Sequence, residues 1–233
     1  MQSRRKLARD KQRIEEQLTR ELMEKVSGKL KSLALRQHAL ISETKRIGDQ
    51  HRIKKRWSRG LLKSLKLAAN TQHDLQQAAE QLAGELSKTE IIALAVRGAA
   101  NNMEQAAEQL QARKTGNTTL QFQQAAHRRL RDLITAIQAD NEVKPEGNPR
   151  TGGGGASNNQ DDLNSEIISQ LTQLRVLKTL QTEILTRTVA LDKQRRPETP
   201  LSAAEQQELK HLTEEQARLT ELTRIIMRTL QRK

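Results

Sequence analysis

Apolar residues recur at alternating steps of three and four over most of this chain. One stripe of this kind runs from Val26 to Ile47, and a second runs from Leu61 to Leu86. A mean spacing of about 3.5 residues lines these side chains up along one seam of a helix, the pattern of knobs-into-holes packing. The chain is therefore predicted to be all-α, with long helices that pair along narrow apolar seams.

The composition favours such seams over a broad core. Hydrophobic residues make up 34% of the 233 residues and charged residues 30%, with one Trp, one Phe and no Tyr. Aromatic side chains bury the most area per residue, so a large compact core is not expected. The absence of Cys excludes disulfides, thiolate metal sites and a cysteine nucleophile.

Six stripes are predicted to form three antiparallel coiled-coil hairpins. The first turn is expected at Gly48, and the second at Thr115 and Gly116, with Gly116 in the left-handed position. Ser202 and Glu205 form a capping-box pattern that predicts the start of the last helix. The expected segments are a basic hairpin over 1–88, an Ala/Met-rich hairpin over 89–140, a flexible Gly/Pro/Asn linker over 141–160 and a C-terminal hairpin over 161–233.

The third hairpin is predicted to be an internal repeat of the first. At a constant offset of 144 residues, identical residues include three polar pairs: Gln37 with Gln181, Ser58 with Ser202, and Gln72 with Gln216. Matching leucines count for little, because any two heptad stripes share some. Polar residues matched at seam and turn positions carry the prediction.

The four repeated glutamines, Gln37, Gln72, Gln181 and Gln216, fall on the predicted seams. A polar pair in a seam costs stability, but a slipped register would leave each glutamine facing a leucine without a partner. We therefore interpret these residues as setting the register of the two hairpins rather than as a ligand site.

Positive charge is concentrated at the N-terminal end. Residues 1–66 hold 20 Lys and Arg against 7 Asp and Glu, whereas residues 67–233 hold 21 of each. The densest group surrounds the predicted first turn and is the candidate contact with an anionic surface: Arg52, Lys54, Lys55, Arg56, Trp57, Arg59 and Lys63. Such a patch is typical of binding to nucleic acid or acidic lipid. Trp57 has a second interpretation, as a hydrophobic staple that packs on Leu62 just before a Ser58 cap.

No motif for catalysis is present. The five histidines do not pair at helical spacing, which argues against a helix-borne zinc site, and carboxylates alternate with Lys and Arg as on solvated faces. The sequence predicts no enzyme activity, no cofactor, no metal and no small-molecule substrate. It contains no apolar run of membrane-spanning length and no signal-peptide pattern after Met1.

Several blocks follow one another in a characteristic order: Ile91–Met103, Ala106–Leu110, Thr115–Gly116, Gln123–Leu130, the Gly-rich linker, and Leu174–Gln181 continuing through Thr188. In this order they resemble a family of uncharacterised bacterial, planctomycete-type coiled-coil proteins. The resemblance implies helical hairpins and a location in the cell envelope or periplasm if the chain is a fragment, and it brings no activity or cofactor.

These observations lead to two functional expectations. The first is a non-catalytic structural or interaction protein, an envelope-associated scaffold that binds a protein partner or associates with itself. The alternative is a module that binds nucleic acid or acidic lipid through the basic residues 4–66.

Overall fold

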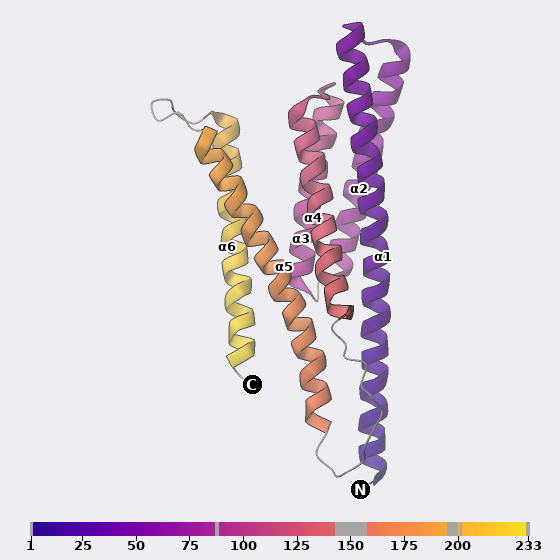
Figure 1. Cartoon of the computed structure of the whole chain (residues 1–233), viewed down its shortest axis with the longest axis vertical. Helices are drawn as coiled ribbons and strands as arrows, with labels where there is room; N and C mark the ends of the chain where they lie inside the picture. Colours follow the sequence, from indigo (N-terminus) through magenta and orange to yellow (C-terminus); the bar gives the residue numbers. More distant parts are fainter. Residues whose placement is uncertain (1, 87–88, 143–157, 195–199, 201, 232–233) are drawn as a thin grey trace. The chain divides into compact units, whose positions relative to one another are not determined.

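The computed structural model describes residues 2–86, 89–142, 158–194, 200 and 202–231, and within them it is all-α (Figure 1). The helices are α1 (Gln2–Lys54), α2 (Arg59–Glu85), α3 (Glu90–Gln111), α4 (Asn117–Glu142), α5 (Asn158–Gln194) and α6 (Ala203–Gln231). The chain divides into two compact units, Met1–Ile168 and Ser169–Lys233. Most of the linker predicted at 141–160 lies outside the described residues, and its ends are helical.

Helices α1 to α4 form one four-helix bundle. In the bundle α1 packs on α2, α2 on α3, α3 on α4, and α4 returns to α1 (Figure 1). Short connections join consecutive helices, which makes each pair antiparallel. The hairpins predicted over 1–88 and 89–140 therefore share one core.

The core of the bundle consists of the predicted seams. All members of the stripes from Val26 to Ile47 and from Leu61 to Leu86 are buried. The same holds for the predicted stripes of α3 and α4, which consist of Ile92, Val96, Ala99, Met103, Ala106 and Leu110 and of Gln123, Ala126, Leu130, Leu133 and Ile137. Each fully buried leucine contributes about 1.5–3 kcal/mol relative to an exposed one. Where α2 meets α3, both helices present several buried alanines, which let the two backbones approach closely.

The first turn differs from the prediction. Helix α1 continues past Gly48 to Lys54, and Lys55 takes the left-handed conformation with a φ of 48°. The N–H of Lys55 donates to the carbonyl of His51 (2.8 Å), as in a helix C-cap of the αL type. Gly48 has another role, since a Cβ there would lie 3.1 Å from the Thr115 carbonyl oxygen. The glycine thus allows the α3–α4 turn to touch α1.

The second turn also places a basic residue where glycine was expected. Helix α3 ends in a Schellman motif: the N–H of Arg113 donates to Leu110 (3.0 Å) and the N–H of Lys114 donates to Gln109 (2.8 Å). Arg113, with a φ of 58°, holds the left-handed position predicted for Gly116. Gly116 instead immediately precedes α4, where its carbonyl accepts from Leu120.

The second unit contains the C-terminal hairpin. Arg187 of α5 binds two carboxylates of α6, with 2.5 Å from Nη2 to Glu208 Oε1 and 3.2 Å from Nη1 to Glu215 Oε2. The predicted capping box is confirmed, because the N–H of Ser202 donates to Glu205 Oε2 (2.7 Å) and the N–H of Glu205 donates to Ser202 Oγ (3.3 Å). Buried apolar residues on the two helices include Leu177, Ile184, Leu212, Leu219 and Ile226.

Candidate functional site

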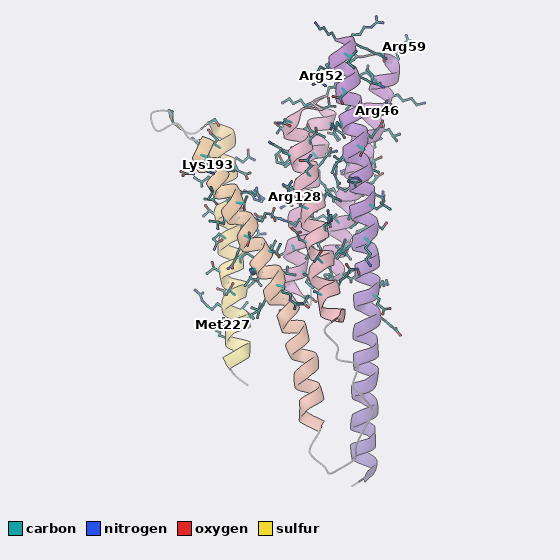
Figure 2. All side chains as sticks on the ribbon, in the orientation of Figure 1. Arg46, Arg52, Arg59, Arg128, Lys193 and Met227 are labelled. Atoms are coloured by element: carbon teal, nitrogen blue, oxygen red, sulfur yellow. The ribbon has the colours of Figure 1, made fainter. Side chains whose placement is uncertain are left out.

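The connection between α1 and α2 forms a basic tip, defined here as His51–Lys63, at one end of the bundle. Figure 2 shows Arg52 and Arg59 at this end. All six predicted cations of the tip, Arg52, Lys54, Lys55, Arg56, Arg59 and Lys63, are exposed. No Asp or Glu occurs between Gln50 and His73. The candidate set therefore lies on the connection and on the two helix ends that it joins.

Ion pairs neutralise little of the charge of the tip. Arg52 donates to Asp49 Oδ1 over 2.9 Å at its base, with 80% of the Arg52 side chain exposed. The other five cations make no ion pair with any residue that the structure describes. By contrast, Arg46 further down α1 holds Glu43 at 2.6 Å and lowers the pKa of that carboxyl through the hydrogen bond. Positive charge without an acidic neighbour is therefore densest at the tip, where residues 51–66 hold seven Lys and Arg and no Asp or Glu.

Trp57 is half-buried and stacks on His51, with ring centroids 4.0 Å apart and planes 18° from parallel. The next residue, Ser58, is the N-cap of α2, and its Oγ accepts from the N–H of Leu61 (3.3 Å). The stack joins Trp57 to the last turn of α1, and the predicted packing of Trp57 on Leu62 stays a prediction. One face of the indole is covered, which leaves less of it for stacking on a base.

The α3–α4 turn adds two cations that the sequence prediction missed. Arg113 and Lys114 are exposed and lie next to Thr115, which touches α1 at Gly48. They are far from the first turn in sequence, so only the packing of the two hairpins reveals that they share its end of the bundle. The sequence gives one weak indication that this turn is also basic, because no Asp or Glu occurs between Gln109 and Arg131.

A buried layer of glutamines crosses the bundle. Gln37 and Gln72 exchange hydrogen bonds, with Gln37 Nε2 donating to Gln72 Oε1 (3.2 Å) and Gln72 Nε2 donating to Gln37 Oε1 (2.8 Å). Gln123 of α4 joins them, and its Nε2 donates to Gln72 Oε1 (2.9 Å) and Thr44 Oγ1 (3.0 Å). All four side chains are fully buried. The predicted pair is therefore part of a network of three helices.

The predicted seam position of the other two glutamines is wrong, since Gln181 and Gln216 are both exposed. The physical reason is the number of helices. Two helices bury only the strip along which they touch, whereas Gln37 and Gln72 are also covered by α4. A role of any of these residues in setting register stays a prediction.

Two histidines from distant parts of the sequence meet where α1 packs on α4. The ring centroids of His38 and His127 are 5.3 Å apart. Burial lowers the pKa of His127, and the nearby His38, Arg131 and Arg128 lower it further. No third ligand completes a metal site, because no three His, Asp or Glu side chains gather suitably among the described residues.

Comparisons with known proteins find no match for this chain. No protein-family model, no curated protein and no solved structure matches it. None of the helices in the described ranges is long and apolar enough to cross a membrane. The functional conclusion therefore depends on the basic tip and the packing of the hairpins.

Proposed function

We propose that this protein is a non-catalytic helical scaffold that attaches to an anionic surface through its basic tip. The observation that carries the proposal is the exposure of six cations within the basic tip, without any acidic residue from Gln50 to His73. Lys and Arg clustered in this way attract phosphates by charge and by release of counterions. The bundle is the rigid support that presents them.

The backbone of the two turns favours this function over a merely solvated helix end. Glycine adopts a left-handed φ without steric cost, whereas a residue with a Cβ is strained there. Lys55 and Arg113 nevertheless hold both left-handed positions, one in each turn at this end of the bundle. Each of these positions thus combines a basic side chain with a backbone conformation that costs stability, a combination that occurs at functional sites.

We favour acidic lipid or an acidic wall polymer as the surface, and we extend the proposal to the cell envelope on the family resemblance alone. The tip contains a single aromatic side chain, Trp57, and His51 covers one of its faces. Modules that bind single-stranded nucleic acid use several open aromatic faces. A sequence-independent contact with duplex phosphates is the second candidate, and the cation cluster supports it equally.

The test uses the full chain and vesicles with or without acidic phospholipid, over a range of salt concentrations. Changing Arg52, Lys54, Lys55, Arg56 and Arg59 to Gln should weaken binding by roughly 100-fold or more, since each cation near an acidic membrane contributes about 1 kcal/mol. The matched control removes the same charge from exposed positions elsewhere in the bundle: Lys31, Arg36, Lys45, Arg97 and Arg128.

The control should bind more tightly than the tip variant, and the affinity of the wild type should fall steeply as salt rises. Equal binding by the two variants would show that only net charge matters and would refute the tip as the contact. Duplex DNA in place of vesicles separates the two surfaces. Binding to DNA without binding to acidic vesicles would favour the nucleic-acid candidate.

A further inference from the structure

The C-terminal hairpin carries an uncovered face that corresponds to a covered face of the bundle. At the repeat offset of 144, one set of positions is buried in both hairpins. This set contains Leu33 with Leu177, Leu40 with Ile184, Ala68 with Leu212, Leu75 with Leu219, and Leu82 with Ile226. We take this shared set to be the strip along which the two helices of each hairpin touch, since Arg187 of α5 also reaches Glu208 and Glu215 of α6.

A second set is buried in the first hairpin and exposed in the third. It contains Gln37 with Gln181, Thr44 with Thr188, Leu65 with Leu209, and Gln72 with Gln216. In the bundle, Gln123 of α4 donates to both Gln72 and Thr44, so this face is the one on which the α3–α4 hairpin docks. The matching face of α5 and α6 leaves Leu209 42% exposed.

We propose that the face formed by Gln181, Thr188, Leu209 and Gln216 is a docking surface for the same hairpin of a second copy of this chain. The chain's own precedent shows what fits such a face, namely an antiparallel helical hairpin with an amide at the matching level. The α3–α4 hairpin already occupies the equivalent face of α1 and α2. The hairpin that does not belong to the bundle is the C-terminal one, and it carries amides at Gln181 and Gln216.

The side chains of this face are chemically suited to bind the same face of a second copy. A primary amide both donates and accepts, and the reciprocal bonds between Gln37 and Gln72 show two such groups satisfying each other in a dry core. A twofold dimer buries the same patch of both copies, so that residue i of one copy contacts residue j of the other and the reverse. Because Gln181 and Gln216 both belong to this patch, an amide of one copy can pair with an amide of the other. Residues 67–233 contain equal numbers of acidic and basic residues, so repulsion between copies is small.

This inference does not depend on the basic tip, and its test is separate. The mass of the full chain in solution is measured by light scattering and by sedimentation equilibrium over a range of protein concentrations. We expect the wild type to dimerise and the double variant Gln181→Lys, Gln216→Lys to dimerise at least tenfold more weakly. Both positions are already exposed, so helix content by circular dichroism should not change.

The matched control is Thr186→Lys with Gln207→Lys, which adds the same charge to the same two helices. Both positions are exposed, and so are their counterparts in the first hairpin, Ser42 and Lys63. The control should dimerise like the wild type. A wild type that stays monomeric at all concentrations would overturn the proposal, because the face would then await a different helical partner. Equal dimerisation of the two double variants would also overturn it.

Discussion

At the scale of single residues, Gln123 determines how the buried layer works. Its amide nitrogen donates to Gln72 and Thr44, while its Oε1 is buried without a hydrogen-bond partner in the described structure. Rotating the amide by half a turn would set this oxygen against Gln72 Oε1, so the orientation is fixed. An unsatisfied buried acceptor costs about 1–3 kcal/mol. We therefore predict that the layer favours one arrangement of the helices at a cost in total stability.

Replacing Gln72 with Leu removes the acceptor that Gln37 and Gln123 share. We expect the free energy of unfolding in urea to fall by about 2 kcal/mol or more, because two buried amides lose a partner. Changing Gln37, Gln72 and Gln123 together to Leu removes the unpaired groups as well and should restore the stability. If the triple variant is less stable than Gln72→Leu, the network contributes net stability and this account is wrong.

At the scale of helices, α3 and α4 approach closely at a glycine. The guanidinium of Arg129 lies over Gly98, where an added Cβ would fall 1.4 Å from Arg129 Nη1. Arg129 is 4% exposed, so its charged group has little space into which it can move. Arg129 of α4 can therefore occupy this buried position only because residue 98 of α3 has no side chain.

The variant Gly98→Ala tests this contact against intrinsic helix propensity. Alanine in place of an interior helical glycine normally stabilises by about 0.5–1 kcal/mol, as expected at Gly28, which has no atom within 4 Å of the added Cβ. Gly98→Ala should instead destabilise, because Arg129 must leave its site. Thermal melts of Gly98→Ala and Gly28→Ala compare the two positions directly. An equal rise in melting temperature for both variants would contradict a close contact between Gly98 and Arg129.

The meeting of α1 and α4 predicts a pH dependence. The pKa of His127 is lower in the folded protein than in the unfolded chain, first through burial and then through His38, Arg131 and Arg128. The unfolded chain therefore takes up the proton more readily, so stability should be complete above about pH 6.5 and fall as the pH decreases below it. His127→Gln should reduce this slope in urea titrations between pH 7.5 and 5, values on either side of the histidine range of about 6.5. An unchanged slope would assign the dependence to other groups.

At the scale of the whole molecule, the two units differ in how they complete their cores. The bundle closes a ring of four helices, while the C-terminal unit has a single hairpin whose face with Gln181, Leu209 and Gln216 is exposed. Two-state unfolding is not expected of such a chain. The unit that relies on a second copy should also gain stability as protein concentration rises.

Unfolding in urea should accordingly show two transitions. We expect the one that reports on the C-terminal unit to shift with protein concentration by about 1.4 kcal/mol per tenfold change, as for a dimer that dissociates on unfolding. A fluorescence probe at Trp57 follows the bundle and should show no such shift. Two concentration-independent transitions would contradict dimer-linked stability of the C-terminal hairpin.

Much of the fold was predictable because heptad stripes report burial over many residues at once. The stripes in α1 and α2 and the contact between Gln37 and Gln72 follow from that pattern. Heptads do not show which hairpin docks on which, so the contacts of Gln123 with Gln72 and of His38 with His127 were not foreseen. Heptads also do not predict that Gln37 is buried under α4 whereas Gln181, at the matching position of the C-terminal hairpin, is exposed. At the turns, the preference for glycine misled, since Lys55 and Arg113 take the left-handed positions.

The extension of α1 beyond Gly48 has a consequence for the range of the electrostatic field. The α3–α4 turn touches α1 at Gly48, and six further helical residues lead to Lys54, which raises the tip by about 9 Å at 1.5 Å per residue. The Debye length at physiological ionic strength is about 8 Å. Carboxylates along the body of the bundle are thus largely screened from the tip, so an approaching polyanion meets the local charge of the turn rather than the average charge of the protein.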